Sequence, residues 1–292
     1  MKKSYEIDMC NGPLLGKILV FSIPLMLSGI LQLLFNAADI IVVGRFAGST
    51  ALAAVGSTAS LINLMINVFV GLSVGVNVLA ARYYGAQKEK DIQDTVHTAI
   101  MMAILSGLFL VVLGESASKP MLTLMGTPDD VLDQAALYLR IYFLGLPFLF
   151  MYNVLSAMFN ALGKSRIPLY FLIFSSVFNV VLDIIMVTKM DMGVAGVAWA
   201  TLIAQGISAV LSFAVLIKNL NDLEGKQKTL FDTMELSEMT RIAIPSILQQ
   251  STVSIGMMLV QSVVNGFGSE ALAGFSAAMR IESICVVPMS AI

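Results

Sequence analysis

The chain has 292 residues, of which 58% are hydrophobic and only 12% charged, and its mean hydropathy is +0.87. A soluble domain carries about 25% charged residues, so this composition excludes an ordinary soluble protein and indicates an all-α polytopic membrane protein surrounded by membrane lipids. The formal net charge of -2 says nothing about partners, because charges in such a protein report its topology. No basic face suggests a nucleic acid. Cys10 and Cys285 are too few and too far apart to form a disulfide framework or a metal site.

Long apolar runs predict eight helices, because backbone groups in lipid must hydrogen-bond within their own segment. In chain order these helices cover residues 14–43, 51–81, 93–114, 134–162, 167–188, 193–217, 238–265 and 271–292. Pro24 and Pro147 could bend the first and the fourth helix. Gly71 and Gly75 in the second helix have the G-x-x-x-G spacing of close helix packing, a signal that is weak by itself.

The distribution of basic residues predicts a cytoplasmic N-terminus. In that orientation twelve of the 17 Lys and Arg residues fall on inner positions and four on outer ones, while Arg280 lies within the last segment. An acidic outer loop is expected at residues 115–133. No cleaved signal peptide is expected, because residues 1–13 are polar and the first apolar run is long enough to remain as a membrane span.

Two parts of the chain resemble each other across a polar stretch at residues 219–236. Ile23-Pro24 matches Ile244-Pro245, and the stretch from Gly48 matches the one from Gly268. Six helices lie between the copies, an even number, so the repeats would share one orientation, as in transporters built of parallel repeats. We therefore expect an N-lobe at 1–218, a cytoplasmic linker at 219–236 and the start of a C-lobe at 237–292. A fragment of a chain of roughly 440 residues is favoured over a complete eight-helix protein.

Two aspartates lie inside apolar runs, and a carboxylate in a membrane span costs several kcal/mol and usually serves a function. Asp39 and Asp183 each lie six residues, or about 9 Å along a helix, before a basic residue at the outer end of the span, Arg45 or Lys189. Thr201 lies about 15 Å inside the next helix. These three oxygen-bearing side chains could therefore meet in the outer half of one lobe.

Helical spacing adds amide neighbours to the two aspartates. Asn179 shares a face with Asp183 at i, i+4, and Asn36 shares one with Asp39 at i, i+3. Carboxylate, amide and hydroxyl oxygens suit a hard cation such as Na⁺, whereas two close carboxylates could instead share a proton. Alternatively, each aspartate pairs with a basic residue or caps a broken helix, and the amide and hydroxyl groups only hold helices together.

The sequence contains no signature of an enzyme. It has no H-E-x-x-H, P-loop or G-x-S-x-G motif, which argues against an ATP-driven pump and against an intramembrane hydrolase. No cofactor is expected, and the only ion implied is a coupling ion, Na⁺ or H⁺.

Several stretches in combination resemble the multidrug and toxic compound extrusion (MATE) family. They are IPLMLSGILQLLFNAADIIVVGRFAGSTALAAVG, ARYYGA, MFNALGKSR, FNVVLDIIMV and GVAGVAWATLIAQ. The resemblance implies two six-helix lobes around a V-shaped cavity. It also implies export of lipophilic, often cationic, drugs or toxic compounds across the cytoplasmic membrane of a bacterium, driven by entry of Na⁺ or H⁺.

The resemblance also implies roles for particular residues. The family's N-lobe cation site falls on Asp39, Asn179, Asp183 and Thr201, with Asn153 and Tyr138 as further neighbours, and its first-helix hinge falls on Pro24. Two alternatives remain open. One is a flippase of lipid-linked precursors from the same wider superfamily, which would be expected to carry more cationic residues for a phosphate head group. The other is a non-transporting membrane scaffold of half length.

Overall fold

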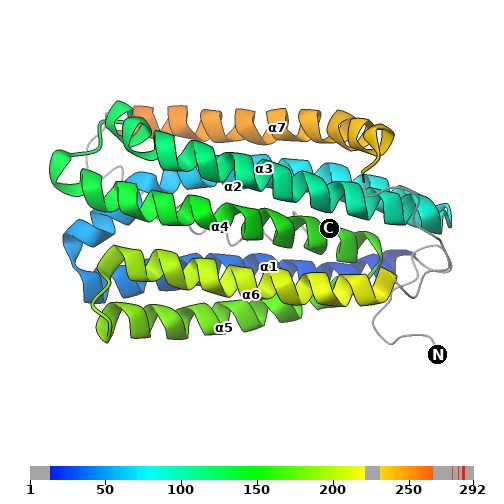
Figure 1. Cartoon of the computed structure of the whole chain (residues 1–292), viewed down its shortest axis with the longest axis horizontal. Coiled ribbons are helices and arrows are strands. Elements are labelled where there is room, and N and C mark those ends of the chain that lie inside the picture. Colours follow the sequence, from blue (N-terminus) through cyan, green and yellow to red (C-terminus); the bar gives the residue numbers. More distant parts are fainter. Residues whose placement is uncertain (1–13, 221–230, 266–277, 279–281, 283–284, 287–292) are drawn as a thin grey trace.

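The computed structural model describes residues 14–220 and 231–265, together with the isolated residues 278, 282, 285 and 286. Within these residues the chain forms long helices that run side by side along one axis, with no strands (Figure 1). The elements are α1 (Leu14–Val42), the π-helix η1 (Val43–Ala47), α2 (Ser49–Gly85), α3 (Glu89–Leu124), α4 (Asp129–Ala161), α5 (Arg166–Thr188), α6 (Gly193–Leu220) and α7 (Thr233–Asn265). Of the helix predicted at 271–292, only residues 278, 282, 285 and 286 are among the described residues, and these four are helical.

Six helices of the described chain are long and apolar enough to cross a membrane, namely α1 together with η1, and α2 to α6. They confirm the prediction of an all-α, multi-pass membrane protein. Proline does not end the helices that contain it, because α1 continues through Pro24 and α4 continues through Pro147.

Several helices are longer than predicted. The acidic outer loop expected at 115–133 is mostly helical, because α3 continues to Leu124 and α4 begins at Asp129. Its charged side chains pair across the hairpin: Lys119 Nζ lies 2.8 Å from Asp133 Oδ1 and Arg140 Nε lies 3.9 Å from Glu115 Oε2. Likewise, α6 extends to Leu220, and residues 233–236 of the predicted linker form the first turn of α7.

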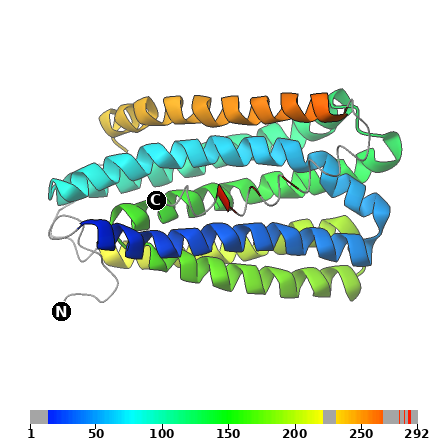
Figure 2. The same ribbon diagram turned by 180° about the vertical axis from the view of Figure 1, so that it is seen from behind.

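The central helix of the bundle is α4, which contacts α2, α3 and α6 along its length. Figures 1 and 2 show α2, α3 and α7 on one side of α4 and α1, α5 and α6 on the other. Phe69 of α2 stacks on Phe150 of α4 with ring centroids 4.7 Å apart. Lipid tails are as apolar as these side chains, so close van der Waals contact, not water exclusion, holds such helices together.

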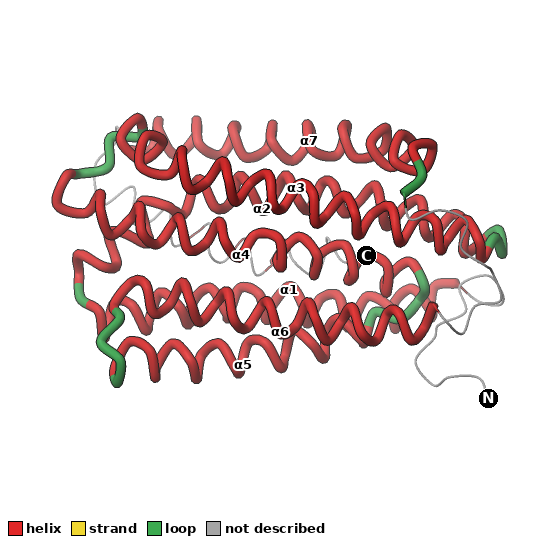
Figure 3. The backbone as a smooth tube through the Cα atoms, in the orientation of Figure 1, coloured by secondary structure: helices red, strands yellow, loops and turns green. Residues whose placement is uncertain are grey.

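The seventh helix, α7, packs along α2 (Figure 3). The predicted G-x-x-x-G pair lies in this contact. A Cβ atom on Gly75 would lie 2.5 Å from the backbone oxygen of Met239, and one on Gly71 would lie 2.7 Å from Ile247 Cγ1. Farther along the same seam, Asn67 Nδ2 donates a hydrogen bond to Ser254 Oγ at 2.9 Å. The two glycines therefore permit an approach of α7 that no larger residue would allow.

Candidate functional site

Asp39 of α1 and Asp183 of α5 lie together in the interior of the bundle. Asp39 is 8% exposed and Asp183 is fully buried. The helices that carry them pack against each other, and one side-chain nitrogen, Asn179 Nδ2, lies 2.9 Å from one carboxyl group and 3.2 Å from the other. The structure thus brings together the two residues that the depth count placed at one level.

Asn179 and Thr201 complete the cluster. The hydrogen-bond partners of the Asn179 amide identify which of its two end atoms is the nitrogen. In this orientation Nδ2 lies 2.9 Å from Asp39 Oδ1 and 3.2 Å from Asp183 Oδ2. Its oxygen accepts a hydrogen bond from the Thr201 backbone N–H at 3.2 Å. The Thr201 hydroxyl lies 3.5 Å from Asp39 Oδ2. Oxygen-bearing side chains from α1, α5 and α6 therefore meet at one point, as expected from the sequence.

One carboxylate oxygen of the cluster has no partner. Asp183 Oδ1 is buried and makes no hydrogen bond. A buried acceptor without a donor costs about 1–3 kcal/mol, and more when it is charged. The ion pairs that the structure shows among the described residues involve neither Asp39 nor Asp183. Their carboxylates belong to Asp91, Asp133 and Glu115. Pairing of Asp39 and Asp183 with basic residues, the alternative reading of the sequence, finds no support in this part of the chain.

Two tyrosines of α4 face the acidic pair. Tyr138, which the family resemblance suggested, is 5% exposed and interacts electrostatically with both Asp39 and Asp183. Tyr142 also interacts with Asp39, and its ring centroid lies 6.3 Å from that of Tyr138. The sequence reasoning missed Tyr142, although its i, i+4 spacing from Tyr138 places the two on one helical face.

The remaining candidate residues lie outside this cluster. Asn36 is exposed on α1. Asn153 donates its amide hydrogen to the backbone oxygen of Leu149 at 2.9 Å, within its own helix. It lies fifteen residues beyond Tyr138, or about 22 Å along the axis of α4. Pro24 is separated from Asp39 by a similar distance along α1, and its role as a hinge stays a prediction.

An open cleft of about 260 Å³ lies at one end of the bundle, where η1, α2, α4 and the start of α6 meet. It is lined by Ala47, Ala51, Gln134, Leu137, Asp191, Met192, Gly193, Val194 and Ala195. Leu137 adjoins Tyr138 in sequence, and Val194 lies about 10 Å along α6 from Thr201. The cleft therefore approaches the acidic pair from the end of the bundle that the basic residues predict to be outside.

The donor set suits a cation that binds to oxygen, or a proton. Among the residues that the structure describes, no three His, Cys, Asp or Glu side chains gather as transition-metal sites require. Two carboxyl groups and a hydroxyl group offer hard oxygen ligands of the kind that suit a cation such as Na⁺, while the Asn179 oxygen is turned toward Thr201 in this structure. The same two carboxyl groups can also hold one proton between them.

Comparison with known proteins identifies relatives of this chain. The family model MatE matches residues 24–185. The probable multidrug resistance protein YpnP of Bacillus subtilis (strain 168) is 30% identical over 285 residues, which cover 97% of this chain and 64% of the relative. The multidrug export protein MepA of Staphylococcus aureus (strain MRSA252) is 22% identical over 93% of this chain and 60% of its own length. The chain thus spans somewhat less than two thirds of the length of these relatives.

Solved structures show the same arrangement of helices. An outward-facing multidrug resistance MATE transporter of the MOP superfamily aligns with a TM-score of 0.89 and 26% identity, over 100% of this chain and 65% of that one. A MATE protein in the straight conformation aligns with a TM-score of 0.85 and 27% identity, over 94% of this chain and 62% of that one. Because the MatE model covers more than half of its residues, the chain belongs to the multidrug and toxic compound extrusion (MATE) family.

Proposed function

We propose that the protein acts as a cation-coupled secondary antiporter that exports lipophilic, often cationic, small molecules. The coupling ion, Na⁺ or H⁺, binds at Asp39, Asn179, Asp183 and Thr201. The observation that carries this proposal is the buried pair of carboxyl groups, one oxygen of which has no partner. The names of the curated relatives, a multidrug resistance protein and a multidrug export protein, support it.

Charge neutralisation is the mechanism that fits this pair. Without a cation, two buried carboxylates on neighbouring helices repel each other, and one neutral amide between them compensates little of that charge. A bound Na⁺ or proton removes the repulsion and stabilises the close approach of α1 and α5. A ligand shifts a conformational equilibrium only by its differential affinity for the two states. Entry of the cation from outside therefore favours the conformation that releases the substrate outward.

The orientation and the domain division belong to the same proposal. The N-terminus lies in the cytoplasm and the protein lies in the cytoplasmic membrane of a bacterium. Residues 1–218 form the N-lobe, 219–236 the cytoplasmic linker and 237–292 the start of a C-lobe. An acidic cluster suits a cation, and it would repel the phosphate head group of a lipid-linked precursor, so the antiporter is favoured over the flippase.

Efflux measurements on the full-length gene product test the coupling. We expect Asp39→Asn and Asp183→Asn each to abolish drug resistance and efflux from proteoliposomes, because either change leaves one carboxylate to hold the cation. Separate sodium and proton gradients across the same vesicles identify the coupling ion. Asp130→Asn, at an exposed position of α4, is the matched control and should transport normally. Wild-type efflux by both Asp39→Asn and Asp183→Asn would contradict the mechanism.

A further inference from the structure

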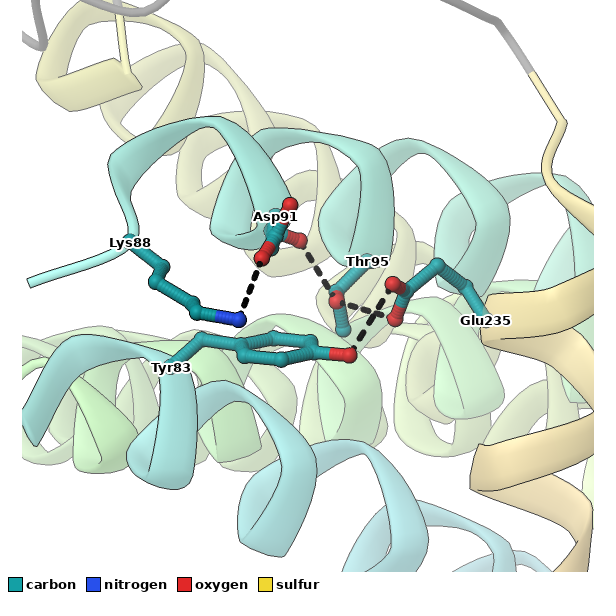
Figure 4. Close-up of polar contacts among 5 residues, drawn as sticks. All are labelled: Tyr83, Lys88, Asp91, Thr95 and Glu235. Carbon is teal, nitrogen blue, oxygen red and sulfur yellow. Dashed lines mark hydrogen bonds and ion pairs between the residues drawn. The ribbon is translucent and has the colours of Figure 1, made fainter. Parts of the chain in front are cut away.

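A buried carboxyl group at the start of α7 joins three helices. Glu235 lies in the first turn of α7 and is 6% exposed. Its Oε1 accepts a hydrogen bond from Tyr83 Oη of α2 at 3.1 Å, and its Oε2 lies 2.9 Å from Thr95 Oγ1 of α3 (Figure 4). Both oxygens of this side chain therefore meet hydroxyl groups from other helices.

The cap of α7 leaves Glu235 available for these contacts. Asp232 Oδ1 accepts hydrogen bonds from the backbone N–H groups of Met234 and Glu235, at 2.8 and 3.4 Å. In a capping box, a glutamate three residues after the cap residue bonds back to the N–H of that residue. Here Thr98 Oγ1 of α3 accepts from the Asp232 N–H instead, at 3.0 Å. The carboxyl of Glu235 is thereby free to turn toward α2 and α3.

Thr95 has one hydroxyl proton but two acceptors within reach. Its Oγ1 lies 2.7 Å from the backbone oxygen of Asp91 and 2.9 Å from Glu235 Oε2. A single proton cannot be donated to both oxygens at once. Both contacts are hydrogen bonds only when the Glu235 carboxyl carries a proton and donates it to Thr95, which then donates to Asp91. If Glu235 were ionised, its carboxylate and the backbone oxygen of Asp91 would compete for the one hydroxyl proton of Thr95.

The electrostatic surroundings of Glu235 also favour its neutral form. Burial raises the pKa of Glu235 above its ordinary value, and this outweighs the hydrogen bonds from Thr95 and Tyr83, which lower it. The charges of Asp232 and Glu238, from its own cap and helix, raise the pKa further.

One pair of opposite charges lies beside this cluster in the α2–α3 hairpin. Lys88, which lies 5.7 Å from the ring of Tyr83, pairs with Asp91 at 3.4 Å, as Figure 4 shows. Because the two charges of this pair compensate each other, the Lys88 ammonium does little to hold Glu235 in its ionised form.

We propose that Glu235 is a protonation-dependent tie between α7 and the α2–α3 pair. In the protonated state its carboxyl holds both Tyr83 and Thr95. Loss of the proton leaves Thr95 with one proton for two acceptors, so one of its two hydrogen bonds is lost, and it leaves a charge in a buried site; both effects loosen the first turn of α7. The tie does not rest on the proposed coupling at Asp39 and Asp183, since it involves other helices and other residues.

A spin label beside Glu235 reports the state of the tie. The label is placed at Met234→Cys, where the side chain is 69% exposed, in a chain that also carries Cys10→Ser and Cys285→Ser. We expect the label to be immobile at acidic pH and to become mobile as the pH rises. In Glu235→Gln it should stay immobile at every pH, because the carboxamide also donates to Thr95 and accepts from Tyr83. The matched control, Glu238→Gln, should keep a response to pH, shifted to lower pH because one of the charges that raise the pKa of Glu235 is removed.

Two results would overturn the proposal. Either Glu235→Gln responds to pH as the parent chain does, or its label is mobile at every pH. An infrared difference spectrum adds a direct readout, since the carbonyl band of a protonated carboxylic acid should disappear in Glu235→Gln and persist in Glu238→Gln.

Substitutions of Thr95 test the tie without changing Glu235. Thr95→Val should make the label mobile even at acidic pH, whereas Thr95→Ser, which keeps the hydroxyl, should preserve the response; equal behaviour of the two would count against the tie. Asp39→Asn should leave the titration unchanged, which separates this test from that of the coupling mechanism.

Discussion

The Asn179 side chain of α5 reaches across to Asp39 of α1, with 2.9 Å between Nδ2 and Oδ1. The same nitrogen lies 3.2 Å from Asp183 Oδ2, so a single neutral amide bridges two buried carboxyl groups. Its oxygen turns toward Thr201 of α6. This one residue therefore links the three helices that meet at the candidate cation site, and it sets the distance between the two acids.

Removal of this amide should weaken cation binding. We expect Asn179→Ala to lower the affinity for the coupling ion by about 5- to 150-fold, the equivalent of about 1–3 kcal/mol for buried groups left without a partner. Binding of radioactive sodium, or the cation dependence of efflux, measures the change. Asn36→Ala, at an exposed position of α1, should change the affinity by no more than about twofold. Equal losses in the two variants would remove Asn179 from the site.

The Thr201 hydroxyl should contribute to the same affinity through its oxygen atom alone. Thr201 is 5% exposed and its Oγ1 lies 3.5 Å from Asp39 Oδ2. Thr201→Val keeps the shape of the side chain and removes the oxygen, so we expect a loss of about 0.5–1.5 kcal/mol, or about 2- to 13-fold in the concentration of cation needed for half-maximal efflux. Thr201→Ser keeps the oxygen and should stay close to the parent. A serine variant as impaired as the valine variant would point to packing instead.

Apolar runs predicted where helices lie but not where they end. The hydropathy of the third run falls near Glu115, yet α3 continues to Leu124, because its backbone hydrogen bonds do not depend on lipid. The Gly71–Gly75 pair predicted a close helix contact without naming its partner. That partner, α7, lies after the polar stretch at 219–236, and a small-residue pattern carries no information about which helix fills it.

Counting residues from the helix ends located the acidic pair, since depth in a helix follows from a constant rise per residue. The same count shows why Asn153 does not join it, for this residue lies far along α4 from Tyr138. Tyr142 shares a helical face with Tyr138, but a tyrosine in an apolar run is usually ordinary packing, so this spacing alone did not identify it. The contacts of Glu235 were equally hidden, because its partners lie on helices more than a hundred residues away in sequence.

The seam between α2 and α7 should be sensitive to a single methyl group. A Cβ atom on Gly75 would lie 2.5 Å from the Met239 backbone oxygen, and a helix backbone cannot yield as a flexible side chain can. We expect Gly75→Ala to destabilise the folded protein by about 1–3 kcal/mol, the cost of overpacking a tight contact. Denaturant unfolding in detergent, followed by circular dichroism, measures this change.

Gly56→Ala is the matched control in the same helix, since a Cβ atom there meets nothing within 4 Å. It should leave stability unchanged or raise it by up to about 1 kcal/mol, because alanine favours a helix more than glycine does. If both variants were destabilised to the same extent, α2 would tolerate alanine at neither glycine. The contact with Met239 would then not be the cause of the destabilisation by Gly75→Ala.

The stability of the fold should depend on pH through Glu235, in a direction set by its raised pKa. In the unfolded chain a glutamate loses its proton near its ordinary pKa of 4.5, whereas the folded chain holds that proton to higher pH. The stabilisation by Glu235 is therefore complete below pH 4.5, declines as the pH rises toward the pKa of the folded state, and is constant above it.

Glu235→Gln cannot titrate, so it supplies the reference for this dependence. The free energy of unfolding of the parent minus that of Glu235→Gln should decrease as the pH rises through this window, while the same difference taken with Glu238→Gln should be flatter. A difference that instead increased with pH would mean that the fold favours the ionised carboxylate. In that case Tyr83 and Thr95 would act as donors to a charge, and the first turn of α7 would be held most firmly at neutral pH.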